Sequence, residues 1–452
     1  MARDETIAAI RFGYGLGAPS EGSAGGLIDG LDGPDRMAAQ YPVAGLSKVL
    51  SEMRSYRALD RAVKAGTDGA EAERRAGRDR LQALFTEGFG QAMARIADTP
   101  TPFRERLVWF WADHFTAVGR NLVHRGGAPT YVDEAIRPHV AGSFADMLKA
   151  VVTHPFMLIY LDQAASVGPA SVVGRRRDRG LNENLAREVM ELHTLGVDGG
   201  YTQDDVTELA RLMTGLSMHP ERGFIFRPQM AEPGNFRVMG RTYGGGDPTL
   251  AHVLAAMDDL ARHPATAAHM ARKLAVHFVA DDPDPDLVSQ IAVAWRESGG
   301  DLAHVYAALL DHPAAWAPLG GKARQPFDFV GATLRAVGAR GRDISEMDPG
   351  SLRRFLARPM AGMGQPWMSA RGPDGWPEAA SRWITPQGLA VRITWARSVT
   401  DRLAERIGDP RAFLDRALAD AASERLRWAV GAAETRAEGA ALVLVSAEFN
   451  RR

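Results

Sequence analysis

The segment Asn182–Val206 holds the densest set of side chains that could do chemistry. At about 100° per residue, Glu188 and Glu191 lie on the side of a helix opposite to its apolar face. Their carboxylates are three positions apart and therefore neighbours of like charge. If both are buried, the pKa of one rises, which is how a carboxyl group becomes a general acid near neutral pH. The segment predicts Glu188 as a general acid or base and Glu191 as its charge partner or a second carboxylate.

The same helix carries side chains that could orient a substrate. Arg187 is four residues from both Glu183 and Glu191, and Asn184 shares their face. We expect Arg187 and Asn184 to orient a substrate. The alternative is structural: Arg187 bridges two carboxylates on a solvated face, and His193, in the apolar face, is a hydrogen-bonded core residue.

A second candidate is the segment ERLVWFWADHF, residues 105–115, where Asp113 and His114 interrupt an apolar aromatic helix. A buried Asp is costly unless it is paired, and Arg106 lies on nearly the same face. The functional interpretation is that His114 lines a site together with Glu188 or His154 and supplies acid/base or metal-binding capacity. The structural alternative is an internal network of Asp113 with Arg106 or a histidine that fixes helix packing.

Three His-Pro pairs occur at the ends of apolar helical segments, at His154, His263 and His312. Proline cannot continue the previous helix but can begin the next one, so these pairs are explained by backbone mechanics alone. The functional alternative gives His154 further acid/base or metal-binding capacity.

The loop Tyr160–Gly180 follows the first of these helices. Asp162 lies at the exit from the helix, a position where loops often carry function. Arg175–Arg177 could hold an anionic substrate or a polyanion, although short basic runs are usually solvated.

Composition excludes several classes of protein. The 452 residues carry 54 Lys+Arg against 55 Asp+Glu, a formal charge of -1, which argues against a globally basic nucleic-acid binder. No cysteine is present, which excludes disulfides, thiolate metal ligands and a Cys nucleophile. No apolar run approaches about 18 residues, so no membrane span is expected. Asp4 and Glu5 do not fit a signal peptide, and we expect a soluble cytoplasmic protein.

Helical periodicity dominates the elements that must position these residues, and strand-like alternation is scarce. The pattern predicts a mainly α protein, a large multi-helix array with one small β-hairpin near 222–245. We expect a single domain over 1–452, with a possible N-terminal helical lobe over 1–100 and a motif-bearing body over 101–452. Predicted helices cover 70–97, interrupted near Gly88–Gly90, then 103–118 and 202–217, and Asn182 is the expected cap of the helix that carries Glu188.

Much of the chain resembles a bacterial family known as domain of unknown function 1800. The resemblance is carried by RFGYGLG (11–17), ERLVWFWADHFT (105–116), HPFMLIYLDQAASVGPAS (154–171), GLNENLAREVMELHTLGVDGGYTQDDV (180–206), HPATAAHMARKLAVHFVADDP (263–283), and MGQPW with GWP (363–377). It implies a large, mainly helical domain without an established activity. The motif positions fall here on His114, Arg137, His154, Asp162, Asn182, Glu183, Asn184, Arg187, Glu188, Glu191 and His193.

One departure from the family concerns the hairpin region. Related sequences often carry a His-Glu or His-Asp pair before a Pro-Gly turn, and this chain has Ala231 and Glu232 there. If that histidine is a metal ligand or catalytic base in relatives, the activity of this chain is altered or lost.

Two hypotheses follow. The first is a hydrolase-like enzyme that uses paired carboxylates in a helical cleft, including for glycosidic bonds, with a His/Glu metal site as a variant. Its catalytic residues are Glu188, Glu191 and His114, and its substrate-binding residues are Arg187, Asn184, Asn182, Asp162, His154 and Arg137. The second is a non-catalytic helical binding or assembly protein whose polar motif is a structural network. The sequence assigns no substrate, metal, cofactor, partner or oligomeric state.

Overall fold

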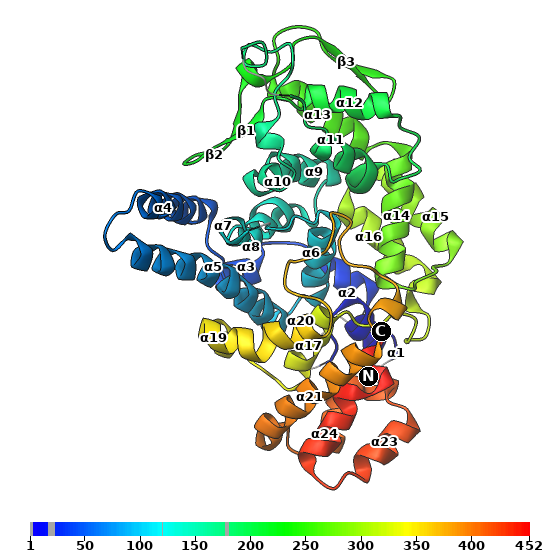
Figure 1. Ribbon diagram of the computed structural model, residues 1–452. Helices are drawn as coiled ribbons and strands as arrows, with labels where there is room; N and C mark the ends of the chain where they lie inside the picture. Colours follow the sequence, from blue (N-terminus) through cyan, green and yellow to red (C-terminus); the bar gives the residue numbers. More distant parts are fainter. Residues whose placement is uncertain (1–2, 17–22, 120, 177–179) are drawn as a thin grey trace.

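The structure is a computed structural model that describes residues 3–16, 23–119, 121–176 and 180–452 (Figure 1). It is mainly α-helical, which confirms the predicted fold class. The longer helices are α4 (Leu46–Lys64), α5 (Ala70–Asp98), α6 (Pro102–His114), α9 (Phe144–Thr153), α12 (Gln203–Leu212), α13 (Leu250–Ala261), α14 (Pro264–Phe278), α15 (Pro285–Ser298), α16 (Leu302–Asp311), α17 (Pro326–Ala336), α21 (Pro386–Ile407), α22 (Pro410–Leu418), α23 (Glu424–Gly431) and α24 (Arg436–Val445).

Two β-hairpins replace the single one predicted near 222–245. β1 (Leu216–His219) pairs with β2 (Gly223–Phe226), and β3 (Asn235–Val238) pairs with β4 (Arg241–Gly244), both antiparallel. The short 3-10 helix η6 (Pro228–Met230) and residues 231–234 separate the two pairs, and strands of four residues are too short to be distinguished by alternation alone.

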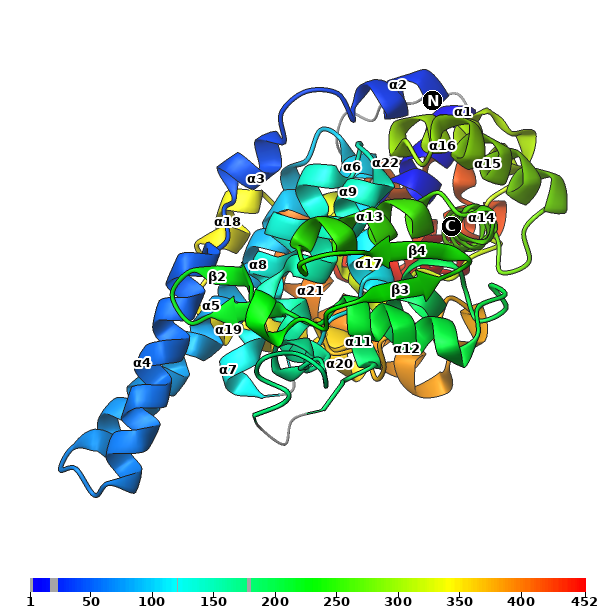
Figure 2. The same cartoon turned by 90° about the horizontal axis from the view of Figure 1, so that it is seen from above.

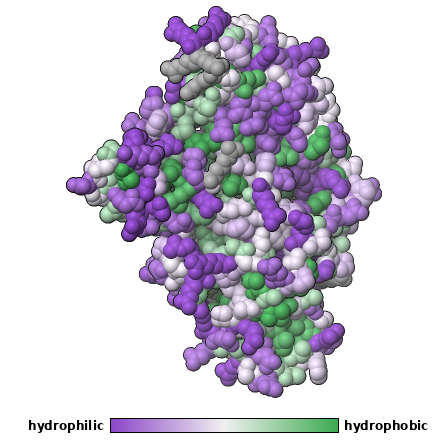
Figure 3. Space-filling view, viewed as in Figure 1, coloured by the Kyte–Doolittle hydropathy of each residue, from purple (hydrophilic) through white to green (hydrophobic). Residues whose placement is uncertain are grey.

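Two large hydrophobic cores share the molecule. The first gathers side chains of α6, α9 and α12–α16, and the second gathers those of α17, α21, α22, α24 and the last turns of α5. Trp109 of α6 and Met368 pack against both cores. Figure 1 places the C-terminal helices α21–α24 at the end opposite the hairpins, and Figure 2 shows α4 and α5 extending away from the body as a pair. In Figure 3 this face is largely hydrophilic, with apolar residues gathered toward the end formed by the C-terminal helices.

α5 runs without a break through Gly88 and Gly90, where an interruption was predicted. A Cβ on Gly88 would lie 2.4 Å from Cγ of Pro129, and one on Gly90 would lie 2.8 Å from Cδ1 of Leu352. These glycines therefore allow close packing of neighbouring elements on α5, a role that helix propensity cannot reveal.

α6 ends at His114, four residues earlier than the sequence predicts. Beyond it, the Thr116 hydroxyl donates a hydrogen bond of 2.6 Å to the backbone oxygen of Asp113. No helix in the described ranges combines the length and the apolar character needed to cross a membrane.

The His-Pro pairs at His154, His263 and His312 begin a helix in the same way, whereas a fourth pair, His219–Pro220, lies at the turn that joins β1 to β2. Nδ1 of His154, His263 and His312 accepts a hydrogen bond of 3.2 Å from the backbone N–H two residues later, and the proline occupies the first turn. The histidine ring therefore acts as a helix N-cap. This agrees with the explanation from the backbone properties of proline, and it adds a role for the histidine side chain as the helix cap.

We expect Gly88→Ala to lower the free energy of unfolding by about 1–3 kcal/mol, because the added methyl group overlaps Pro129. Gly25→Ala is the matched control, since that helical glycine has no heavy atom within 4 Å of the added Cβ. Urea denaturation of both variants measures the effect. Equal stability of Gly88→Ala and the unchanged protein would contradict the packing argument.

Candidate functional site

Two helices face each other through polar side chains inside an apolar interior. We call this set the polar seam: His269, Lys273 and His277 of α14, and His114, Asp113 and Arg106 of α6. The three α14 residues are four positions apart and therefore share one face. His114 lies near His269 and Arg106 contacts His277, so the two helices run in opposite directions along the seam.

At one end, the seam holds a π-helix in place. η5 (Val189–Thr194) continues α11 (Asn184–Glu188) with a wider backbone spacing. Nε2–H of His114 donates to the His193 carbonyl at 3.2 Å, and Nδ1–H of His269 donates to the Thr194 carbonyl at 2.8 Å. Two histidines thus satisfy carbonyl groups at the end of this helix.

His193 is fully buried beside them, as the apolar pattern predicts, but the hydrogen bonds expected of it in the structural alternative are not formed. Neither ring nitrogen has a hydrogen-bond partner in the structure, and burial lowers its pKa to about 3, with the charge of Lys273 acting in the same direction. Burial also lowers the pKa of His114 far below its usual range. Both rings are neutral at physiological pH, so His114 is a hydrogen-bond donor here.

In the middle of the seam lies Asp113. Its carboxylate accepts the Trp376 backbone N–H at 3.0 and 3.2 Å. Gly375 has φ +81, and a Cβ there would lie 2.7 Å from the Asp113 backbone oxygen, so only glycine lets this segment approach so closely. Burial and then the charge of Glu378 raise the pKa of Asp113 to about 7.

Lys273 is the cation of this region. Burial lowers its pKa, while the charges of Asp113, Glu378 and Asp374 act in the opposite direction. It is therefore placed among three carboxylates that come from α6 and from the segment after residue 373.

At the other end, Glu378 stays ionised. Nδ1 of His277 contacts its Oε1 at 2.5 Å, and Nζ of Lys322 lies 3.1 Å from its Oε2. Nε2 of the same histidine faces Nη2 of Arg106 at 2.9 Å, and since a guanidinium only donates, Nδ1 carries the proton shared with Glu378. Burial opposes ionisation, but His277 and Lys322 outweigh it and lower the pKa of Glu378 to about 2.

The predicted pair Glu188 and Glu191 lies at the junction of α11 and η5. Burial, then the charge of Glu191 and then that of Asp374 raise the pKa of Glu188 to about 7. Glu191 in turn raises the pKa of Tyr201 by its charge and a hydrogen bond, after the larger effect of burial. The shift at Glu188 has the cause that the sequence predicted, namely partial burial beside a like charge.

Asp374 joins the two groups of carboxylates. Its charge raises the pKa of both Glu188 and Asp113, so it lies within electrostatic range of each. We call the resulting set the carboxyl cluster: Asp113, Glu188, Glu191, Asp374 and Glu378. Figure 1 shows the segment that carries Asp374 as a long irregular trace beside α6.

A pocket with an empty volume of about 710 Å³ opens beside Asp113. Its polar lining includes Arg106, Asp113 and His277, and its aromatic lining includes Trp109 and Trp367. The pocket therefore lies where the two hydrophobic cores meet, since Trp109 packs against both. This site combines concave shape, apolar walls and a carboxyl group of raised pKa, as binding pockets commonly do.

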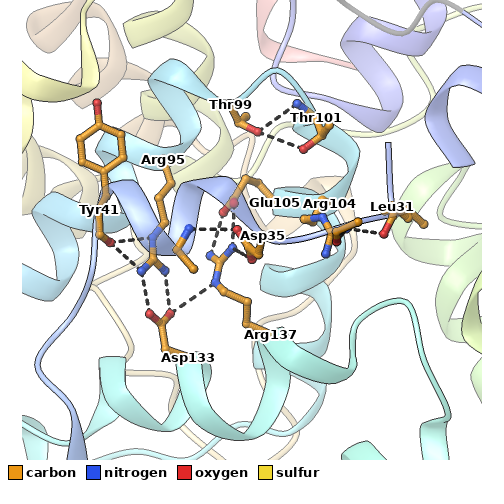
Figure 4. A network of polar contacts seen from close by, with 12 residues as sticks. Leu31, Asp35, Tyr41, Arg95, Thr99, Thr101, Arg104, Glu105, Asp133 and Arg137 are labelled. Atoms are coloured by element: carbon orange, nitrogen blue, oxygen red, sulfur yellow. Dashed lines mark hydrogen bonds and ion pairs between the residues drawn. The ribbon is translucent and has the colours of Figure 1, made fainter. Parts of the chain in front are cut away.

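Other predicted residues lie elsewhere and have structural contacts. Figure 4 shows Arg137 bonded to both carboxylate oxygens of Glu105 at 2.8 and 2.9 Å, to Asp35 at 2.9 Å and to Asp133 at 3.4 Å. His154 caps its helix, and its Nε2 lies 3.6 Å from Glu134. These contacts account for both side chains without a substrate.

The helix that carries Glu188 is anchored by its neighbours in sequence. Oδ1 of Asn182 accepts the backbone N–H of Asn184, whose own side chain is exposed. Arg187 bonds to Glu183 at 3.2 Å and to Gln203 at 3.0 Å, as in the solvated-bridge alternative, although toward Glu183 and not Glu191. Substrate binding by these residues stays a prediction.

The loop after α10 (Pro155–Tyr160) has its own anchors. Asp162 adopts a left-handed conformation (φ 57) at its start. Glu232 accepts the Ala170 backbone N–H at 2.8 Å and so fastens the loop to the hairpin region. Arg175 and Arg176 are exposed, and Arg177 lies outside the described residues.

Sequence reasoning gave least weight to the residues that complete the site. The sequence favours a structural network for Asp113, and the segment 363–377 stands out only as part of the family resemblance. The composition of the segment 363–377 could have indicated the site, because it places glycines close to Trp367 and Trp376 in an otherwise helical region. In the described ranges, no three His, Asp or Glu side chains gather as a metal site would require.

We expect His193 to make the protein sensitive to acid. Its folded pKa of about 3 lies below its unfolded value of about 6.5, so the unfolded state binds more protons between these two pH values. Stability is therefore fully present above about pH 6.5 and falls as the pH decreases, by an amount on the order of 4 kcal/mol for this group.

His193→Leu removes this titration, so the stability lost between pH 7 and pH 4 should be smaller than in the unchanged protein. Denaturant titrations at several pH values measure it, and His304→Leu, at an exposed position, is the control. An unchanged pH dependence in His193→Leu would show that His193 is not buried as a neutral ring.

Comparison with known proteins gives one result. No curated protein and no solved structure matches the chain. Residues 17–451 match a family described as proteins of unknown function, DUF1800. The match covers nearly the whole sequence, and the chain belongs to the DUF1800 family.

Proposed function

We propose that the chain is an acid/base enzyme of the hydrolase type, in which Asp113 and Glu188 transfer the protons. The observation that carries this proposal is the pair of carboxyl groups whose pKa is raised to about 7, each of them influenced by the charge of Asp374. Side chains with such pKa values hold either protonation state at neutral pH, as general acids and bases require.

The environments of Asp113 and Glu378 support distinct roles. Asp113 is buried with few hydrogen bonds to its charged form, while Glu378 is held as an anion by His277 and Lys322. Neighbouring carboxyl groups with separated pKa values commonly divide acid and base roles. Asp113 lines the pocket, so it is placed to protonate a leaving group of a bound substrate.

Glu188 is the proposed base for the attacking water. It is half-buried, and Glu191 and Asp374 keep its pKa near neutrality. Glu191 is the charge partner in this proposal. His114 does not transfer protons here, because both its burial and its bond to the His193 carbonyl assign it to supporting η5.

A second candidate is a non-catalytic binding protein with the same pocket. It is favoured by the structural contacts of Arg137 and His154, two of the motif positions. Only the enzyme turns over a substrate. The two candidates also differ in how the stability of the protein changes when a carboxylate is neutralised. Removal of strained functional carboxylates leaves stability unchanged or raised, whereas removal of a partner from a structural network lowers it by about 3–5 kcal/mol.

The test is hydrolysis of 4-nitrophenyl esters and glycosides between pH 5 and pH 9. We expect a rate maximum near pH 7, because one carboxyl group must be protonated while the other is ionised. Asp113→Asn and Glu188→Gln should each lower kcat/KM by about 10²–10⁴-fold without loss of folding. Glu208→Gln is the control, since Glu208 pairs with Arg211 on the exposed side of α12.

Carbon NMR of the two carboxyl groups tests the same proposal without a substrate. Titration of Asp113 and Glu188 near pH 7 is the expected result. Ordinary values near pH 4 for both groups, or full activity in both variants, would exclude the proposed roles.

A further inference from the structure

Four arginines gather around a single carboxylate, Asp328, which lines the pocket together with one of them, Arg106. Arg106, Arg324, Arg392 and Arg452 are each at most 2% exposed. Arg106 pairs directly with Asp328, and Nη1 of Arg452 lies 3.3 Å from it. Burial lowers the pKa of Arg324 and of Arg392 to about 10, and the charge of Asp328 is what opposes this effect in both.

This group has more positive charge than its carboxylate can balance. Asp328, Glu378 and Asp281 supply three carboxylates for these four arginines and for Lys322, which pairs with both Asp281 and Glu378. Arg324 and Arg392 lie 4.8 Å from the ring centroids of Phe449 and Phe329, which attract cations but bear no net charge. Buried charge without a counter-charge is costly, so this cationic group is suited to an anion.

The pocket also contains N–H groups without an acceptor. Nε of Arg106, Nε1 of Trp109 and Nε1 of Trp367 are buried and have no hydrogen-bond partner, and all three residues line the pocket. Buried donors are paired in the great majority of cases, so three in one pocket need an explanation.

The other buried or half-buried indoles give the contrast. Nε1 donates to an oxygen within the protein in Trp111, Trp295, Trp316, Trp383 and Trp395, whereas no such bond is formed by the half-buried Trp376, which also lines the pocket. Trp109 and Trp367 are thus distinguished by their position at the pocket, and an oxygen-bearing ligand would supply the acceptors that they lack.

The aromatic lining defines the rest of the ligand. Phe327 and Trp367 stack with ring centroids 5.6 Å apart and planes at 18°, and Trp109 lies 5.0 and 4.9 Å from them. A flat apolar body fits beside such rings. A protonated Asp113 would not repel an anion at neutral pH, whereas an ionised one would.

We propose that this pocket binds an organic carboxylate with a flat apolar body, whose oxygens accept the N–H groups of Arg106, Trp109 and Trp367 and whose charge balances the arginines around Asp328. This inference deepens the proposed function, because it assigns the class of substrate on which the carboxyl cluster acts.

The test compares 2-naphthoate with its uncharged amide, 2-naphthamide, on the full chain. Isothermal titration calorimetry gives both affinities, and quenching of tryptophan fluorescence reports on the pocket. We expect 2-naphthoate to bind at least 10-fold more tightly than 2-naphthamide. Equal affinities, or no saturable binding of 2-naphthoate, would overturn the proposal, and this comparison needs no variant.

Trp109→Phe and Trp367→Phe each keep an aromatic ring and remove one N–H donor. Each should weaken 2-naphthoate binding at least 5-fold, while Trp428→Phe, at a position 74% exposed, should leave it unchanged. Unaltered affinity in both pocket variants would assign the ligand to another place on the protein. The melting temperature of each variant confirms that it is folded.

Failure of this proposal and failure of the proposed function are separate results. Binding requires no turnover, so Asp113→Asn should retain 2-naphthoate while it loses hydrolysis. Binding of 2-naphthoate without any hydrolysis by the unchanged protein would support the carboxylate pocket and contradict the proposed enzyme activity. Hydrolysis of neutral substrates without binding of 2-naphthoate would support the enzyme activity and contradict the carboxylate pocket.

Discussion

The arrangement of the molecule depends on burial of charged and polar side chains along one line between α6 and α14. Six buried or half-buried polar residues on two otherwise apolar helices can lie together only if each finds a partner or changes its protonation state. His114 and His269 meet carbonyl groups of η5, and Glu378 meets His277 and Lys322. Asp113 and Lys273 are shifted toward their neutral forms.

This constraint couples segments that are far apart in the chain. The seam fixes η5 at one end, where Glu188 and Glu191 project, and the segment after residue 363 at the other. Gly375 allows that segment to contact Asp113 closely enough for the Trp376 N–H to bond to it. The same helices that bury the seam therefore place five carboxylates from three parts of the chain in one region.

The pocket follows from where the two hydrophobic cores meet. Trp109 and Met368 belong to both, so the pocket is bounded by side chains whose positions two separate cores determine. Rigid walls of this kind suit recognition, because ordering a ligand then costs the protein little. The arginines around Asp328 are also held by contacts with the C-terminal part of the chain, such as the bond from Arg392 to Asn450 at 2.7 Å.

Hydrophobic periodicity in the sequence was enough to determine the helical class, the region of the hairpins and the apolar face in which His193 is buried, because each depends on residues close together in the chain. It also placed Glu188 beside Glu191, since three residues on a helix are spatial neighbours. The sequence could not show that Gly88 and Gly90 serve packing, that Arg137 meets Glu105, or that α14 turns Lys273 toward Asp113. Those facts depend on contacts between distant segments, and the pKa of each buried group depends on the charges that folding brings to it. Only the tertiary structure therefore decided that Asp113, judged structural from its helix alone, lines a pocket with a pKa near neutrality.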